Sequence, residues 1–172
     1  TASGTVVKQS PEAGAPFTET VVVNVARPSV KTYLIELTPV EESDGGLSDT
    51  GNATLNAETL TNSLWMASCN WFDDQSPSVG YNLSRAYTRF HTIVGMQDDQ
   101  VSGSFAQFRV FGDGRQLADI RADLGAPQTI DVDVSGVHRL TIQATGVGCN
   151  SYTHDPVYAT WGDPYLTSPP RE

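Results

Sequence analysis

Apolar and polar residues alternate with a period of two along most of this sequence. Side chains alternate between the two faces of an extended strand, so this pattern predicts strands that are buried on one face. No amphipathic helix longer than two turns and no internal repeat interrupts it. The chain is therefore predicted to be all-β. The clearest segments are ETVVVNV (19–25), KTYLIEL (31–37), YTRFHTIV (87–94), SFAQFRVF (104–111), QTIDVDV (128–134) and HRLTIQA (138–144).

Short turn motifs separate these segments. The sequences GDG at 112–114 and SG at 135–136 suit tight hairpins, whose central residues need positive φ angles. Many short strands with turns at such regular spacing indicate a β-sandwich or a barrel. We predict a single antiparallel sandwich.

The two ends of the sequence differ in composition from its middle. Residues 1–18 are rich in Ser, Thr, Ala, Gly and Pro, and residues 167–172 contain a Pro pair. Such tracts are typical of extended, solvated spacers between secreted domains. We predict two linker-like ends around one domain at 19–166, which would be a module of a longer protein.

The charge balance excludes some classes of partner. Ten Lys and Arg residues against 20 Asp and Glu residues give a formal net charge of −10. Nucleic acids and anionic membranes are bound mainly through Lys and Arg, so neither is an expected partner. No stretch approaches the roughly 18 consecutive apolar residues of a membrane-spanning helix, and no membrane insertion is expected.

Strand direction predicts where the connections lie. If each strand reverses direction after Cys69, the longer connections emerge together at one end and the short turns emerge at the other. Long loops on a rigid scaffold commonly carry binding surfaces, so the first end is the candidate site. Its connections are residues 69–78, 97–102, 121–127 and 146–156, and the opposite turns are 84–86, 112–114 and 135–136.

Aromatic and polar residues are concentrated in two of the long connections. A sugar presents an apolar C–H face and a rim of hydroxyl groups, which an aromatic ring beside Asp or His can match. One or two of these rings could instead cap the core, where Trp65 and Trp161 are expected to pack. The candidate ligand-binding residues are Trp71, Phe72, Asp73, Asp74, Tyr152, His154, Asp155 and Tyr158.

The two cysteines, Cys69 and Cys149, have no His neighbours at the spacing of zinc ligands. They are either buried free thiols or a disulfide. Strand parity places both at the same end, and the spacer-like termini suggest an extracellular setting, so we predict a Cys69–Cys149 disulfide. Closing such a long loop would stabilise the fold by about 4.5 kcal/mol in the chain-entropy model.

Two adjacent carboxylates, Asp98 and Asp99, follow the segment 87–94 at the long-loop end. Glycosidases need two carboxylates about 5 to 9.5 Å apart on either side of the scissile bond, which adjacent residues on a turn rarely provide. Two readings remain, a solvated turn or ligands of a structural Ca²⁺, which prefers carboxylate and carbonyl oxygens.

The order of several motifs resembles one family of modules. The segments TYLIELTPV, YNLSRAYTRFHTIVGMQDD, FRVFGDGRQL, IDVDVSGVHRLTIQA and YATWGDPYL resemble the novel putative carbohydrate-binding modules (NPCBM), which are related to carbohydrate-binding module family 51. The resemblance covers residues 30–166. It implies an antiparallel jelly-roll β-sandwich, a secreted or surface bacterial protein, a structural calcium ion, and glycan ligands that commonly contain galactose.

Two classes of function remain. The first is a non-catalytic carbohydrate-binding module, covalently linked to other domains of its parent protein. The second is a protein-binding or structural adhesion domain on the same sandwich, because a fold does not fix its ligand. An enzyme is not expected, since the sequence has no G-x-S-x-G, H-E-x-x-H or P-loop motif.

Overall fold

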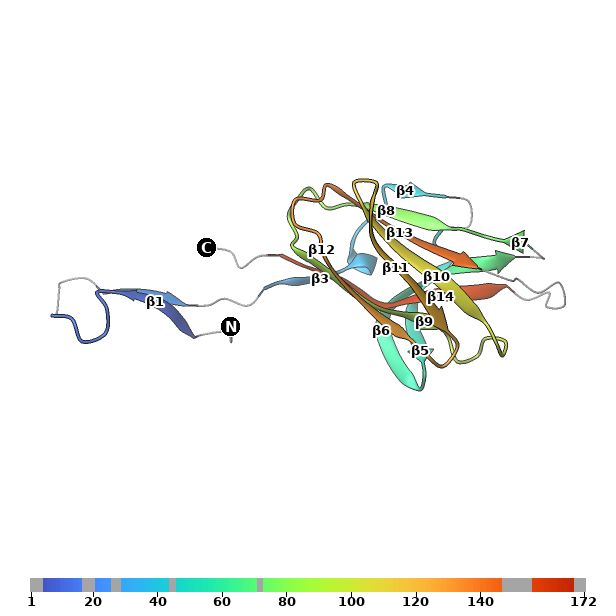
Figure 1. Ribbon diagram of the computed structural model, residues 1–172, viewed down its shortest axis with the longest axis horizontal. Coiled ribbons are helices and arrows are strands. Elements are labelled where there is room, and N and C mark those ends of the chain that lie inside the picture. The colour runs from blue at the N-terminus through green and yellow to red at the C-terminus, as the bar shows by residue number, and fades with distance from the viewer. Residues whose placement is uncertain are drawn as a thin grey trace.

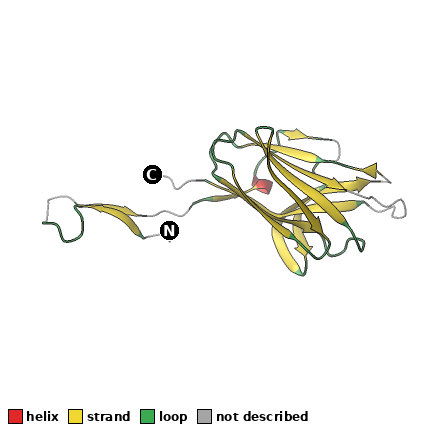
Figure 2. Ribbon diagram, in the orientation of Figure 1, coloured by secondary structure: helices red, strands yellow, loops and turns green. Residues whose placement is uncertain are grey.

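The computed structural model is built almost entirely of β-strands, with one turn of 3-10 helix (Figure 2). It describes residues 5–16, 21–25, 29–43, 46–70, 73–146 and 156–168. No helix in these ranges is long and apolar enough to span a membrane.

Two antiparallel sheets face each other and form the sandwich (Figure 1). In the first sheet the spatial order is β11 (Arg115–Asp123), β10 (Phe105–Gly112), β13 (Arg139–Gly146), β8 (Ser78–Asn82) and β4 (Glu41–Glu42). In the second sheet it is β12 (Gln128–Asp133), β9 (Arg89–Met96), β14 (Val157–Thr167), β6 (Glu58–Asn70) and β5 (Asp49–Leu55). The short strands β3 (Lys31–Tyr33) and β7 (Asp73–Asp74) pair with β14 and β6.

The chain crosses repeatedly between the two sheets. From β8 onward it runs to β9 in the second sheet, back to the β10–β11 hairpin in the first, and then through β12, β13 and β14 in alternate sheets. This connection pattern is that of a jelly roll. The predicted all-β jelly-roll sandwich is therefore confirmed.

The core lies between the sheets and is made by the inward residues of the alternating segments. Phe108 of β10 and Trp161 of β14 are both fully buried and contact each other edge to face, with ring centroids 5.3 Å apart. Aromatic side chains bury large areas and so dominate the energetics of such cores. The prediction for Trp161 is confirmed.

Trp65 was expected in the core, and this prediction is wrong. Its neighbours Leu64 and Met66 are fully buried in the core, so Trp65 points to the opposite, outer face of β6. There its ring lies over Gly51, where an added Cβ would be 3.7 Å from Cη2 of the indole. The alternation is regular, but the sequence alone left the parity of this strand undetermined.

The prediction for the segment 31–37 also needs correction. The segment 31–37 is not one strand, because Leu34–Glu36 form a 3-10 helix in which Leu34 is fully buried. The carboxylate of Glu36 accepts the backbone N–H of Tyr33 at 2.9 Å, which satisfies a donor at the start of that turn.

The two predicted hairpin turns have different outcomes. Asp113 and Gly114 have positive φ angles and join β10 to β11 as a true hairpin. Gly136 also has a positive φ angle, but β12 and β13 belong to different sheets. The 134–138 segment is therefore a crossover between sheets rather than a hairpin.

The β5–β6 hairpin folds back over the outer face of the second sheet, which no sequence pattern indicated. Leu55 and Leu60 are almost fully buried there, outside the main core. The two leucines fill space that is open because Gly95 and Gly162 have no side chains. An added Cβ on Gly95 would lie 3.4 Å from Leu55, and one on Gly162 would lie 2.2 Å from Leu60. The tip of the hairpin is thus packed against β9 and β14.

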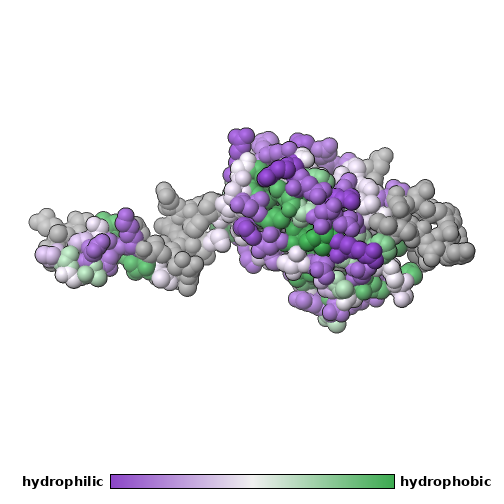
Figure 3. Space-filling model, in the orientation of Figure 1, coloured by the Kyte–Doolittle hydropathy of each residue, from purple (hydrophilic) through white to green (hydrophobic). Residues whose placement is uncertain are grey.

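The predicted domain boundaries stay a prediction. Within residues 1–18, β1 (Val6–Ser10) pairs with β2 (Val22–Val25) in a separate two-stranded sheet, drawn apart from the sandwich in Figure 1. The tail 167–172 lies largely outside the described residues. In the view of Figure 3, hydrophilic side chains cover much of the sandwich surface, with hydrophobic groups visible between them.

Candidate functional site

Strand pairing gathers the long connections at one end of the sandwich. Gln128 pairs with Val94, Ala106 with Gly146, and Val157 with Cys69. In antiparallel sheets, paired residues lie at the same level along the strands, so the segments beyond them emerge together. This end, formed by the connections 71–77, 97–104, 124–127 and 147–156, is called the long-loop end below. The flanking strand ends confirm the predicted parity of the loops, whereas residues 71–72 and 147–155 themselves lie outside the described residues.

The opposite end consists of turns that are held by their own side chains. The carboxylate of Asp113 accepts the backbone N–H groups of His138 and Arg139, the latter at 2.8 Å. These hydrogen bonds favour the charged form and lower the pKa of Asp113 below its ordinary value. This end is built for stability, and it presents compact turns rather than long loops.

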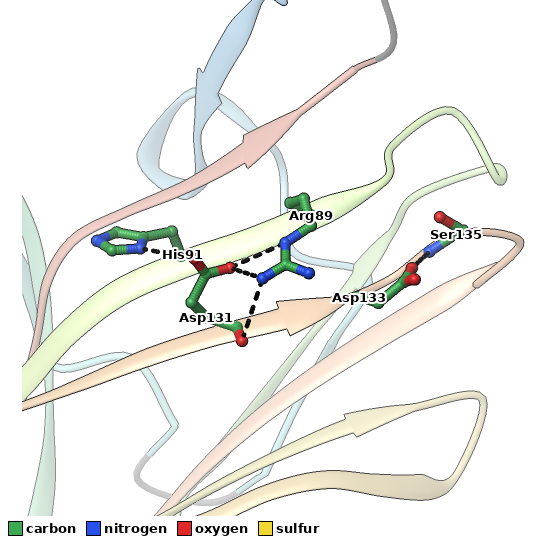
Figure 4. A network of polar contacts seen from close by, with 5 residues as sticks. All are labelled: Arg89, His91, Asp131, Asp133 and Ser135. Atoms are coloured by element: carbon green, nitrogen blue, oxygen red, sulfur yellow. Dashed lines mark hydrogen bonds and ion pairs between the residues drawn. The ribbon is translucent and has the colours of Figure 1, made fainter.

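A polar network at that end joins β9 to β12 on the outer face of the second sheet (Figure 4). Asp131 accepts hydrogen bonds from the guanidinium of Arg89 and lies 3.8 Å from Nδ1 of His91. Asp133 accepts the backbone N–H of Ser135 at 2.7 Å, which lowers the pKa of its carboxyl. The lowered pKa of Asp133 disfavours its use as a general acid.

Most of the predicted ligand-binding residues lie outside the described residues. This holds for Trp71, Phe72, Tyr152, His154 and Asp155. The backbones of Asp73 and Asp74 form β7, which pairs with Asn70 and Cys69 at the end of β6, whereas their side chains lie outside the description. Tyr158 is half-buried near the start of β14. The ligand-binding role of these eight residues stays a prediction.

Cys69 is buried at the long-loop end, with 8% of its surface exposed. An added Cβ on Gly146 would lie 2.8 Å from its Sγ, so the chain that leads to Cys149 passes beside the sulfur. The described residues contain no free cysteine. Cys149 itself lies outside them, and the Cys69–Cys149 disulfide stays a prediction.

Asp98 has a structural partner that the sequence did not reveal. Its two carboxylate oxygens accept the backbone N–H groups of Asn56 and Ala57 at 2.6 and 2.8 Å. Its own N–H donates to the carbonyl of Thr54 at 3.0 Å. Asp98 therefore caps the turn of the folded-back β5–β6 hairpin, which the fold carries to the long-loop end.

The predicted calcium site can be compared with these contacts. Ca²⁺ takes six to eight oxygen ligands, whereas no group of three or more His, Cys, Asp or Glu residues gathers anywhere in the described part of the chain. Both oxygens of Asp98 already accept backbone N–H groups, and Asp99 accepts a 3.3 Å hydrogen bond from the side-chain amide of Gln100. The described residues do not fit a calcium cage, and ligation by Asp98 and Asp99 stays a prediction.

Gln100 links the same loop to β14. Its side-chain oxygen accepts the backbone N–H of Tyr158 at 3.0 Å, across 58 positions of sequence. The 97–104 loop therefore contacts both the hairpin turn and the strand that follows the longest connection. Sequence reasoning missed Asn56, Ala57 and Gln100, because no local signal shows that the hairpin folds back.

The family model of the NPCBM/NEW2 domain matches residues 75–167, which is more than half of the 172-residue chain. The chain belongs to the NPCBM/NEW2 family. The predicted family is thereby confirmed. No curated protein matches the sequence.

Solved structures of family 51 carbohydrate-binding modules share the fold. One is the module of Clostridium perfringens GH95 in complex with methyl-galactose (20% identity, TM-score 0.61), with 80% of this chain and 100% of that chain covered. A second holds the CBM51-2 and INT domains of C. perfringens ZmpB with GlcNAc (18%, 0.62; 87% and 34% covered). A third is the tandem CBM51 modules of Streptococcus pneumoniae Sp3GH98 (14%, 0.56; 80% and 47% covered). This NPCBM domain thus spans one module of longer chains in the latter two comparisons.

Proposed function

We propose that this NPCBM domain is a non-catalytic carbohydrate-binding module that binds a glycan at its long-loop end. The observation that carries the proposal is the match to the NPCBM/NEW2 model over residues 75–167, on a sandwich that gathers its long connections at one end. The short turns at the opposite end leave no comparable loop surface.

A galactose-containing glycan is the proposed ligand class. The related C. perfringens GH95 module was solved with methyl-galactose, and the family resemblance points the same way. The aromatic residues Trp71 and Tyr158 would contact the apolar face of a sugar, while Asp73, Asp74 and Asp155 would accept its hydroxyl groups. One stacked ring with two or three hydrogen bonds corresponds to dissociation constants of about millimolar to micromolar.

A bacterial secreted or cell-surface protein is the proposed setting. Related modules occur beside other domains, as in ZmpB and Sp3GH98, so we infer that this module is covalently linked to further domains. The predicted disulfide would be stable in the oxidising environment outside the cell. The net charge of −10 disfavours nucleic acid as a partner.

The test is glycan-array binding with the wild-type chain, followed by variants. We expect Trp71→Ala to abolish retention on galactose-containing glycans while the melting temperature changes little. Tyr158 and Tyr165 offer a matched pair, since both are half-buried tyrosines of β14. Tyr158→Ala should weaken binding, and Tyr165→Ala, seven residues further toward the short-turn end, should not. Retention of no glycan by the wild-type chain would refute the proposal.

Protein binding is the second candidate, and the β1–β2 hairpin favours it. Val6, Val21 and Val22 are each 51% exposed, and Val23 is 47% exposed. These four exposed valines lie on or beside one two-stranded hairpin, and exposed apolar surface commonly marks contacts with other proteins. If the array is negative, we expect this hairpin to carry the adhesive function, and Val22→Ser together with Val23→Ser should remove it.

A further inference from the structure

We propose that Asp98 and Gln100 are positioning residues of the glycan site, which fix the 97–104 loop and the start of β14 before any ligand arrives. This inference rests on the proposed function, because it assigns a role within the same long-loop end. Neither residue needs to contact the sugar. Their role is to hold Tyr158 and the adjoining loop in one arrangement.

The first part of the argument is the strained turn at Asn56 and Ala57. Their φ angles are 50° and 65°, in the left-handed region. Ala has no special tolerance for this region, where the Cβ of an L-residue comes too close to the following carbonyl oxygen. The carboxylate of Asp98 accepts both backbone N–H groups at 2.6 and 2.8 Å. Hydrogen bonds to a charged acceptor are strong enough to hold such a turn.

The second part is the packing beneath that turn. Leu55, adjacent to the turn, is 1% exposed, and its side chain packs over Gly95 on β9. The Asp98 N–H also donates to Thr54 at 3.0 Å. The hairpin tip is therefore fixed to the second sheet by side-chain burial, and Asp98 ties the 97–104 loop to that fixed point.

The third part is an irregularity in β14. The register with β6 shifts between Val157 and Tyr158, and the pairing with β9 begins only at Ala159. Gln100 supplies the acceptor for the Tyr158 N–H at 3.0 Å. The Tyr158 N–H is part-buried and lies before the first β9 pair, at Ala159, so the Gln100 side-chain oxygen accepts its hydrogen bond in place of a strand partner. It thereby ties the 97–104 loop to the start of β14, one residue after the strand begins at Val157.

These contacts together pre-organise the long-loop end. A chain of contacts runs from the packed hairpin tip through Asp98 and Gln100 to Tyr158. Loops that are ordered in advance lose less conformational entropy when a ligand binds. Removing either link should therefore weaken binding even though the sugar still meets the same side chains.

The experiment measures methyl-galactose binding and amide hydrogen exchange in the same variants, at a temperature where all are folded. Gln100→Ala removes the acceptor and should weaken binding roughly two- to tenfold, the value of one hydrogen bond. It should also speed exchange at the Tyr158 amide. Gln100→Glu replaces the amide by a carboxylate, whose oxygen also accepts a hydrogen bond, so it should keep both the wild-type binding and the slow exchange at Tyr158.

Variants of Asp98 test the other link. Asp98→Ala should speed exchange at the Asn56 and Ala57 amides and weaken binding. Asp113→Ala is the matched control and should change neither, because Asp113 accepts backbone N–H groups of His138 and Arg139 at the opposite end of the sandwich. Ala57→Gly relieves the strain of the left-handed turn, so adding it to Asp98→Ala should recover part of the lost protection.

The outcomes separate the two proposals. If the wild-type chain binds methyl-galactose and the Gln100→Ala and Asp98→Ala variants bind it equally well, the positioning role is refuted while the proposed function stands. If the wild-type chain does not bind methyl-galactose, the galactose assignment and the positioning role both fail. Unchanged exchange at the Tyr158 amide in Gln100→Ala would overturn the Gln100 link directly.

Discussion

Replacing Gly146 by Ala should destabilise this domain more than an ordinary glycine substitution in a strand. Gly146 is the last residue of β13, in the first sheet, and its backbone touches β6, in the second. A Cβ at this position would lie 2.1 Å from the carbonyl oxygen and 2.7 Å from the carbonyl carbon of Ser68. Stacked sheets normally lie about 10 Å apart, so the glycine allows the two sheets to approach at the long-loop end.

The magnitude follows from what would have to move. The Ser68 carbonyl accepts the Gln75 N–H at 2.9 Å, and the Gly146 N–H donates to the Gln75 carbonyl at 3.1 Å. Relieving the overlap therefore shifts backbone and strains both bonds, unlike an overlap with a flexible side chain. Overpacking of this kind costs about 1 to 3 kcal/mol or more. For a domain of this size, 1 kcal/mol lowers the melting temperature by about 2 to 4 °C, so we expect a decrease of roughly 2 to 12 °C.

The assay is thermal unfolding by calorimetry, repeated as urea unfolding. Gly80→Ala is the matched control, since Gly80 lies on β8 of the same sheet and an added Cβ would be 3.3 Å from Cβ of Glu41. That neighbour belongs to the two-residue edge strand β4, which can shift, so the control should cost less than about 1 kcal/mol. Equal melting temperatures for Gly146→Ala and the wild-type chain would refute the reasoning.

Three further predictions concern the cysteines, calcium and acid. Mass spectrometry without reductant should show the Cys69–Cys149 disulfide as a loss of two hydrogens. Replacing both cysteines by Ser should lower the free energy of unfolding by about 2 to 5 kcal/mol. Two free thiols in an Ellman assay would contradict the predicted disulfide. If calcium is bound, EDTA should lower the melting temperature, and Asp99→Asn should lower it in the same way. Asp98→Asn is not a suitable test of calcium binding, because Asp98 also caps the hairpin turn. The pKa of Asp113 is lowered in the folded state, first by the N–H groups of Arg139 and His138, so its stabilisation is complete above the unfolded-state pKa and is lost as the pH falls through the folded-state value. Asp113→Asn should therefore lower the urea midpoint at pH 7 and change it less at pH 3, and equal effects at both pH values would count against this origin.

The sequence by itself determined most of the strands, the faces of β9, β10, β12 and β13, and the end at which the long loops gather. Period-two alternation is a local property, so β9, β10, β12 and β13 could be placed to within one or two residues. Loop parity follows from counting antiparallel reversals, which needs no knowledge of the sheet order. The burial of Trp161 was predicted from the short apolar run VYATW (157–161) and from its position in the family resemblance.

Only the tertiary structure decided which sheet each strand joins and what Asp98 binds. The SG turn looks like a hairpin locally, yet β12 and β13 separate because each finds its partners elsewhere in the chain. Asp98 meets Asn56 and Ala57 across 42 and 41 positions of sequence. That contact exists because Gly95 and Gly162 let the β5–β6 hairpin pack onto the outer face of the second sheet. Contacts between such distant segments depend on the packing of the whole sandwich, and a local pattern of residues carries no trace of them.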